Sequence, residues 1–164
     1  MSQTKAGQTA PALQLTLLDG STWTLSEAKG QPLLLNFFNG TCPWCQSEMP
    51  RLGKVYDHLK EQKFHVPMIG IIASQETAES AVQFALHCGL DMPLALDGKR
   101  AASAAFGIKR VPTLILIDAQ GLLSRVYEGA SEQLSGIVEQ ALFAAARGDA
   151  APTLELVGNG CAPE

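Results

Sequence analysis

Cys42 and Cys45, three positions apart, are the residues of this sequence whose type and spacing most directly indicate chemistry. They lie in "NFFNGTCPWCQSEMP", after an apolar run and before a segment with helical periodicity. A cysteine at a helix start faces unpaired backbone N–H groups and the positive end of the helix dipole, which both favour a thiolate. We therefore expect the pKa of Cys42 to lie below that of a free thiol, and the thiolate is the reactive form. Cys45 lies one turn further along the same face and can reach back to Cys42.

A structural disulfide and a metal site are the two alternatives for this pair. A disulfide between Cys42 and Cys45 would close a very small loop, so it would constrain the unfolded chain little. A tetrahedral zinc site needs a second pair of ligands, and the three histidines, at 58, 65 and 87, do not form one. The pattern favours a disulfide that is made and broken, and we expect no metal and no cofactor besides a redox-active Cys42–Cys45 disulfide.

The flanking segments predict the elements that must hold these cysteines. "ALQLTLLDGSTWTL" alternates apolar and polar residues around Asp19-Gly20, which indicates a β-hairpin. "PLLLNFFN" is too short and too apolar for a surface helix and suits a strand buried on both faces. The residues from Pro43 to about Lys63 predict an amphipathic helix, bent near Pro50. Further along we expect a strand in "VPMIGIIAS", a helix ending at Gly89, a strand at 94–96, a helix in "RAASAAFG", two strands joined by a turn at 118–121, and a helix over about 131–147.

This order of elements, together with the composition, predicts one α/β domain with helices on both faces of the sheet. At 164 residues the chain can bury a core without disulfides or metals. A net charge of −4 and scattered basic residues give no reason to expect a nucleic-acid partner. No apolar run reaches the length of a membrane span, and the first residues lack the apolar core of a signal peptide.

Two longer motifs carry a family resemblance. "LLLNFFNGTCPWCQSEMP" and "GIKRVPTLILIDAQG" together resemble the thioredoxin superfamily, most closely its TlpA/ResA-like branch of thiol-disulfide oxidoreductases, relatives of the cytochrome c maturation reductants. The resemblance spans about Gly7 to Ala146. It implies a thioredoxin-like α/β fold: a central mixed β-sheet flanked by helices, with an N-terminal β-hairpin and a central strand–helix insertion. We accordingly expect a thioredoxin-like domain over 1–147 and a C-terminal tail over 148–164.

The resemblance also implies a role for Glu48 and gives Asn36 a counterpart in the family. Glu48 matches a glutamate that tunes the active-site thiols, and desolvation would raise its pKa so that it exchanges a proton with Cys45. The alternative is a solvated acid near a helix N-terminus. Asn36 stands where cytosolic thioredoxins usually carry a buried aspartate. We interpret Asn36 as satisfying backbone groups and assign it no catalytic role.

Four residues are expected to bind the partner. Pro43 and Trp44, between the cysteines, would belong to the docking surface, since exposed large aromatics mark contact sites; the alternative for Trp44 is an exposed aromatic without a role. Pro112 matches the cis-proline of the fold, so we expect a cis Val111–Pro112 bond, with the backbone of Val111 free to pair with an extended substrate segment. The alternative for Pro112 is a proline tolerated on a sheet edge. Val111 would then shield the disulfide and help to select partners.

The other two cysteines receive simpler interpretations. Cys88 reads as a buried small hydrophobe at a helix end. Cys161, in "GNGCAPE", is expected to be exposed and mobile. A Cys88–Cys161 disulfide is a disfavoured alternative, because nothing in the sequence fixes the separation of the two residues. A resolving role for Cys161 is disfavoured further.

The expected function is reduction of disulfides in partner proteins by mixed-disulfide exchange at Cys42 and Cys45. An oxidant using the same residues is the first alternative. A thiol peroxidase is the second, although the peroxiredoxin signature fails because Asn39 and Leu35 stand where it has threonine and proline. A docking module without catalysis is the third.

Partners and location follow from the same resemblance. The expected partners are protein thiols and disulfides and an upstream redox protein that recycles the pair, and the protein is expected to act as a monomer. Members of this branch usually work outside the bacterial cytoplasm, so we expect a periplasmic or other extracytoplasmic location, with a cytoplasmic one as the alternative.

Overall fold

The fold is an α/β arrangement with the predicted order of elements. The computed structural model describes residues 6–97, 99–154 and 157–163. One short element was not predicted from the sequence, a 3-10 helix η1 at Leu25–Ala28. The strands are β1 Gln14–Thr16, β2 Thr22–Thr24, β3 Leu33–Phe38, β4 Met68–Ile72, β5 Leu94–Leu96, β6 Thr113–Ile117 and β7 Leu123–Glu128. The helices are α1 Pro43–Glu61, α2 Ala78–Cys88, α3 Ala101–Ala105 and α4 Leu134–Arg147.

The central sheet has the strand order β5-β4-β3-β6-β7. β3 pairs in parallel with β4 and antiparallel with β6, and all six of its residues are buried. Its continuous apolar sequence therefore reflects a strand that is covered on both faces. β1 and β2 form the predicted N-terminal hairpin, antiparallel with Leu15 opposite Trp23.

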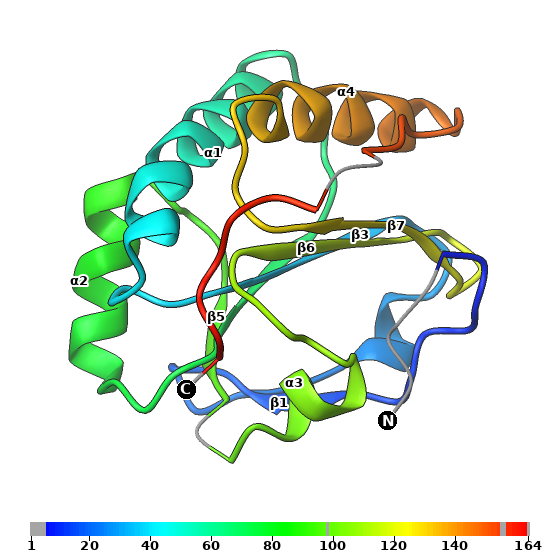
Figure 1. The fold of residues 1–164 in the computed structure, drawn as a ribbon. Coiled ribbons are helices and arrows are strands. Elements are labelled where there is room, and N and C mark those ends of the chain that lie inside the picture. The colour runs from blue at the N-terminus through cyan, green and yellow to red at the C-terminus, as the bar shows by residue number, and fades with distance from the viewer. Residues whose placement is uncertain (1–5, 98, 155–156, 164) are drawn as a thin grey trace.

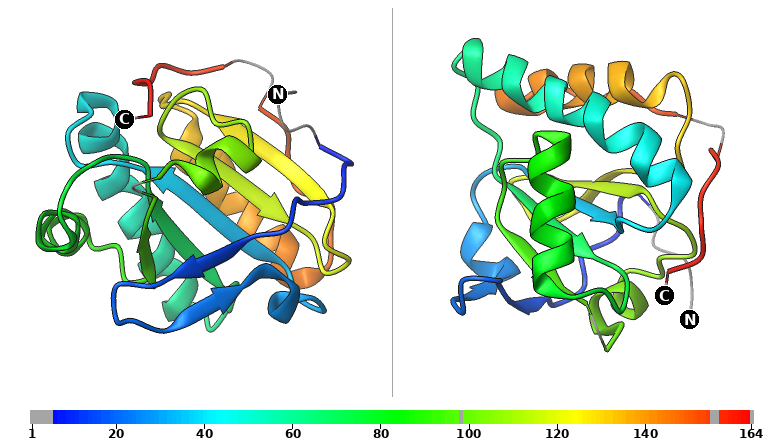
Figure 2. Two further views of the ribbon diagram at one scale, coloured as in Figure 1. Left: turned by 90° about the horizontal axis from the view of Figure 1, so that it is seen from below. Right: turned by 90° about the vertical axis from the view of Figure 1, so that its left-hand side faces the viewer.

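Helices cover both faces of this sheet, as predicted (Figure 1). α1 and α4 lie together on one face, whereas α3 and the hairpin lie on the opposite face. α2 stands beside α1 at the side of the sheet where β5 is the edge strand (Figure 2). The strand–helix unit of β4 and α2 is the insertion that the sequence resemblance implied. These features confirm the thioredoxin-like fold class.

The packing places the start of α1 at the carboxyl end of β3. α1 begins with Pro43 at its first position, where a missing N–H costs nothing, and it carries Pro50 inside. Met49, Leu52 and Tyr56 bury the inner face of α1 in the core. Gly53 lets α2 approach closely, since a Cβ there would lie 2.1 Å from the backbone oxygen of Cys88. The cysteine segment is therefore held between a buried strand and a firmly packed helix.

Candidate active site

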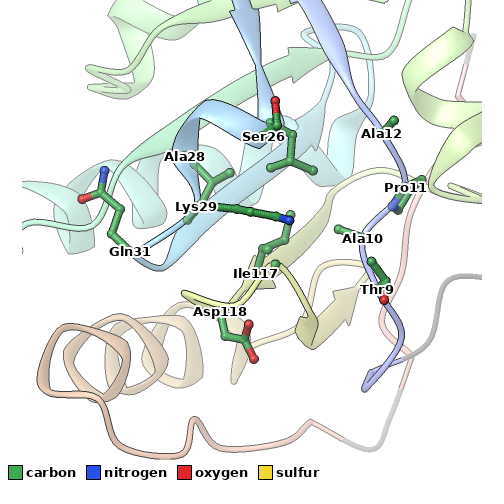
Figure 3. Close-up of a pocket in the computed structure, with 13 residues that line it drawn as sticks. Thr9, Ala10, Pro11, Ala12, Ser26, Ala28, Lys29, Gln31, Ile117 and Asp118 are labelled. Atoms are coloured by element: carbon green, nitrogen blue, oxygen red, sulfur yellow. The ribbon is translucent and has the colours of Figure 1, made fainter.

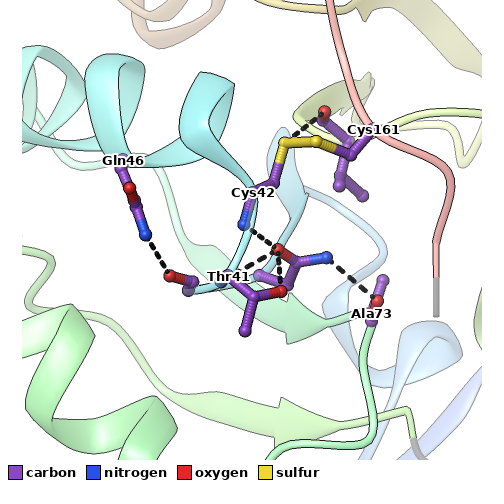
Figure 4. Close-up of a disulfide and its surroundings, with 8 residues drawn as sticks. Thr41, Cys42, Gln46, Ala73 and Cys161 are labelled. Atoms are coloured by element: carbon purple, nitrogen blue, oxygen red, sulfur yellow. Dashed lines mark hydrogen bonds between the residues drawn. A yellow bond between two sulfur atoms is a disulfide. The ribbon is translucent and has the colours of Figure 1, made fainter.

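Asn39 organises the loop that presents Cys42. Its Oδ1 accepts hydrogen bonds from the backbone N–H of Cys42 at 2.8 Å and of Thr41 at 3.2 Å, and from the Thr41 hydroxyl at 3.2 Å (Figure 4). Its Nδ2 donates to the backbone oxygen of Ala73, just after β4, at 3.5 Å. No structural role of Asn39 was predicted from the sequence. An asparagine three residues before a helix-initiating cysteine is a local signal from which this role could have been predicted.

Cys45 is a free thiol that is fully buried in the first turn of α1. Burial, with smaller electrostatic contributions from Glu76 and Cys88, raises the pKa of the Cys45 thiol to about 12. A backbone hydrogen bond from Asn39 opposes this shift. Cys45 is therefore protonated at neutral pH, so its attack on another sulfur requires a group that removes the proton.

Glu48 lies three residues further along α1 and is 1% exposed, so the interpretation as a solvated acid is wrong. Burial raises the pKa of its carboxyl, and the Arg51 guanidinium, 3.7 Å from Oε2, lowers it in part. Its Oε1 has no hydrogen-bond partner among the described residues. A buried carboxylate with an unpaired oxygen binds a proton more readily than usual.

The raised pKa of Glu48 makes the stability of the protein depend on pH in a defined direction. The folded chain binds this proton more tightly than the unfolded chain does, so ionising Glu48 destabilises the fold as the pH rises above the ordinary value of 4.5. We expect Glu48→Gln to raise the melting temperature at pH 7 by about 2–4 °C, with the gain disappearing below about pH 4. Thermal unfolding across this pH range measures the effect, and the exposed Glu61→Gln is the matched control. Equal gains at pH 7 and pH 4 would contradict the role of ionisation.

Glu76, in the segment that follows β4, stabilises the loop 39–42 before α1 by hydrogen bonds. Its Oε2 accepts hydrogen bonds from the backbone N–H of Gly40 at 3.0 Å and from the Ser74 hydroxyl at 2.6 Å. A Cβ on Gly40 would lie 3.2–3.3 Å from Phe84 and from Glu76, so the loop fits tightly here. Glu76 was not predicted from the sequence, since its contact with Gly40 spans 36 positions and no local pattern encodes it.

The predicted substrate-binding residues fall on two sides of Cys42. The Val111–Pro112 peptide bond is cis, as expected, and both residues are buried. The backbone oxygen of Val111 lies 3.9 Å from the Sγ of Cys42. Pro43 and Trp44 are exposed at the start of α1, and Trp44 is 42% accessible to solvent. The site thus has a buried wall at Val111 and an open aromatic beside the cysteines.

The interpretation of Cys161 as an exposed, mobile residue is wrong. The structure contains a disulfide between Cys42 and Cys161, with their Cα atoms 5.9 Å apart (Figure 4). Cys88 is buried and free, as expected of a small core residue, so the alternative Cys88–Cys161 disulfide is absent. Cys42 is 2% exposed. Because a disulfide sulfur does not titrate, the lowered pKa expected for the Cys42 thiol stays a prediction.

The remaining described residues form one notable pocket away from the cysteines. A pocket of about 200 Å³ lies at the other end of β3, between the segment 9–12, η1 and the β6–β7 turn (Figure 3). Its charged residues are Lys29 and Asp118, and Asp118 is engaged in holding the turn through the N–H groups of Gln120 and Leu122. Among the described residues no group of three or more His, Cys, Asp and Glu side chains could hold a metal ion. The same residues include no helix with the length and apolarity needed to cross a membrane.

Comparison with known proteins agrees with this geometry. The Redoxin family model matches residues 5–142. The thiol-disulfide oxidoreductase ResA of Halalkalibacterium halodurans is 36% identical over 129 residues, which cover 78% of this chain and 71% of the relative. The solution structure of a putative thioredoxin from Neisseria meningitidis superimposes with a TM-score of 0.70 at 30% identity, over 85% of this chain and 91% of that one. A hypothetical protein of Sinorhizobium meliloti shares the fold over 99% of this chain and 95% of its own, with a TM-score of 0.83 at 19% identity.

The fold and the cysteine site define a thioredoxin-like protein of the TlpA/ResA-like type. The chain belongs to the Redoxin family, and its relatives support an activity of the thiol-disulfide oxidoreductase class.

Proposed function

We propose that this protein reduces disulfides in partner proteins through Cys42 and Cys45. The observation that carries the proposal is that Cys42 is joined to a cysteine of an extended segment whose backbone pairs with Val111. This is the arrangement that a mixed disulfide with a partner requires: an extended peptide paired with the backbone of Val111 and a sulfur bonded to Cys42.

The reaction proceeds in two exchanges. The Cys42 thiolate attacks one sulfur of the partner disulfide, a Cys42–partner bond forms, and the other partner sulfur leaves as a thiolate that takes up a proton. Glu48 accepts the proton of Cys45, whose thiolate then attacks the Sγ of Cys42. The second partner sulfur leaves, so the partner gains two electrons and the Cys42–Cys45 pair is oxidised. An upstream dithiol protein then restores the pair.

The direction of electron flow rests on the reduction potential. We expect the Cys42/Cys45 couple, titrated in the Cys161→Ser variant with Trp44 fluorescence as reporter, to lie near the value of thioredoxin, about −270 mV. A value near that of the strong oxidant DsbA, about −120 mV, would reverse the assignment and make the protein an oxidant. The Cys161→Ser background keeps the third cysteine from competing for Cys42.

Trp44 is proposed to contact the partner protein. We expect Trp44→Ala to raise KM for a protein disulfide about five- to tenfold, with little change in kcat. The variant lacks the exposed indole and therefore loses the contact area that the indole offers to a partner protein. Its rate with oxidised glutathione should hardly change, because a small disulfide does not reach the surrounding surface. Leu86→Ala, which removes another exposed apolar side chain from α2, is the control. Equal losses with both substrates would place Trp44 in the chemistry instead.

We further propose an extracytoplasmic site of action in a bacterium, as a monomer. An oxidising compartment lets a Cys42–Cys161 disulfide persist between encounters with reductant. Fractionation of cells that carry the full gene, combined with trapping of thiols before lysis, tests the location and the redox state together.

A further inference from the structure

The segment 157–163 is the last described part of the predicted C-terminal tail and is hereafter called the tail. It pairs through isolated antiparallel bridges with Val111 and Ala130, and the surface that these two residues form beside Cys42 is hereafter called the groove. The tail runs past the ends of β6 and β7 (Figure 1). The backbone N–H of Val111 donates to the oxygen of Cys161 at 2.8 Å, and the N–H of Cys161 donates to the oxygen of Val111 at 3.0 Å. Asn159 and Ala130 exchange a second such pair at 2.6 and 2.9 Å. These two reciprocal pairs of backbone hydrogen bonds fix the register of the tail, and they place Cys161 at Cys42.

Two glycines of the tail fit this groove in a way that other residues would not. A Cβ on Gly160 would lie 2.7 Å from the backbone oxygen of Val111 and 3.0 Å from the Arg110 side chain. A Cβ on Gly158 would lie 2.3 Å from the oxygen of Ala130, and one on Gly129 would lie 2.4 Å from Gly158. Backbone atoms cannot yield as a flexible side chain can, so these positions require glycine. Asn159, between the two glycines, points its side chain to solvent and is exposed.

We propose that the tail is an intramolecular substrate of the groove and that Cys161 is a third redox-active cysteine, which resolves mixed disulfides at Cys42. The proposal rests on the proposed function, because it needs Cys42 as the nucleophile that attacks a partner disulfide. Its own evidence is the combination of the disulfide, the two reciprocal pairs of backbone hydrogen bonds and the two glycine contacts.

The exchange balances without any further reagent. When a partner is bonded to Cys42, the Cys161 thiolate attacks the Sγ of Cys42, a Cys42–Cys161 bond forms, and the partner sulfur leaves as a thiolate and takes up a proton. The tail then occupies the backbone groups of Val111 that the partner had used. Attack by the Cys45 thiolate on Cys42 expels Cys161 in turn, and the product is the Cys42–Cys45 disulfide with a free Cys161 thiol.

The Cys42–Cys161 form is thus a closed state of the enzyme. It leaves no room for a partner strand at Val111, and it covers Cys42, which is 2% exposed. Exit through Cys45 first requires removal of the proton that this buried thiol holds. Reductant in the compartment breaks the Cys42–Cys161 disulfide and frees the groove, so partner binding depends on how much reductant is present.

The experiment uses the full chain with Cys45→Ser, reduced and then mixed with oxidised glutathione. Cys42 attacks the glutathione disulfide, and we expect Cys161 to displace the bound glutathione. Intact mass should then show a protein without glutathione, and peptide mapping should show a Cys42–Cys161 link. In Cys45→Ser,Cys161→Ser the glutathione adduct should persist at least about 100-fold longer, since the tethered thiol is gone.

The result that overturns the proposal is a glutathione adduct as long-lived in Cys45→Ser as in the double variant. Such a result leaves the proposed function standing, because Cys42 has still attacked a disulfide. Absence of any adduct in the double variant overturns the proposed function itself, and the inference with it.

A pair of tail variants tests whether binding of the tail in the groove, and not only its covalent attachment to the chain, speeds the attack of Cys161. In the Cys45→Ser background we expect Gly160→Val to slow the displacement of glutathione at least about tenfold, because its side chain would collide with the Val111 backbone. Asn159→Val, one position away and exposed, should change the rate less than about twofold. Equal rates for the two variants would show that Cys161 acts as a loose thiol, and would overturn the assignment of the tail as a bound substrate.

Discussion

Cys42→Ser is expected to lower the rate of protein-disulfide reduction by at least about 10³-fold. A serine hydroxyl is not ionised at neutral pH and forms no disulfide, so the first exchange has no nucleophile. Cys45 cannot replace it, because that thiol is fully buried and its pKa is raised to about 12. Reduction of insulin by the variant, with a dithiol as electron donor, measures the loss.

The matched control is Cys88→Ala, which removes the other buried free thiol. Cys88 lies at the end of α2, where the backbone oxygen of Cys88 packs against Gly53, and the proposed exchange does not use its sulfur. We expect this variant to keep its activity within about twofold. Substantial activity in Cys42→Ser would move the nucleophile to another cysteine and would contradict the whole site.

The local parts of the site could be predicted from the sequence because short-range chemistry determines them. The spacing of Cys42 and Cys45, the apolar run of β3 and the periodicity of α1 all act within about twenty residues. The cis Val111–Pro112 bond and the burial of Glu48 followed from the family resemblance, and the structure has both. Each of these features is fixed by neighbours in the chain or by one motif.

The remaining parts depend on contacts between distant segments. Glu76 reaches Gly40 across 36 positions, and Cys161 reaches Cys42 across 119. A segment that pairs through only a few residues is too short to show an alternating hydrophobic pattern, so its pairing cannot be predicted from periodicity. The sequence did carry one signal, since Gly158 and Gly160 flank Asn159 directly before Cys161. Glycines at alternate positions of an extended segment indicate a close approach of another backbone.

The pairing of the tail with Val111 and Ala130 indicates how partner proteins are recognised. The tail shows which atoms of the groove are available to a strand: the N–H and oxygen of Val111, and those of Ala130 after β7. Such backbone contacts give affinity without selecting a sequence, whereas positions with no room for a Cβ do select. A partner in the register of the tail would need a small residue directly before its reactive cysteine.

The Cys45→Ser,Cys161→Ser variant is expected to hold partner proteins as stable mixed disulfides. With both resolving thiols removed, a partner bonded to Cys42 has no intramolecular sulfur to displace it, and only the partner's own second thiol or an external thiol can do so. An intramolecular thiol acts at a high effective concentration, so its loss should lengthen the life of the intermediate by about 10³-fold or more.

The measurement is capture of a test protein whose single cysteine carries a disulfide to glutathione, so that attack by Cys42 on the protein sulfur releases glutathione and the captured protein has no second thiol of its own. Non-reducing electrophoresis over time follows the complex. Cys42→Ser in the same double background is the control and should capture nothing, because the attacking sulfur is absent. Equally rapid loss of the complex from wild type and double variant would mean that neither Cys45 nor Cys161 resolves it. Persistence in the double variant, with faster release when either Cys45 or Cys161 is restored alone, would assign resolution to both thiols, the buried one in α1 and the one that the tail brings to the groove.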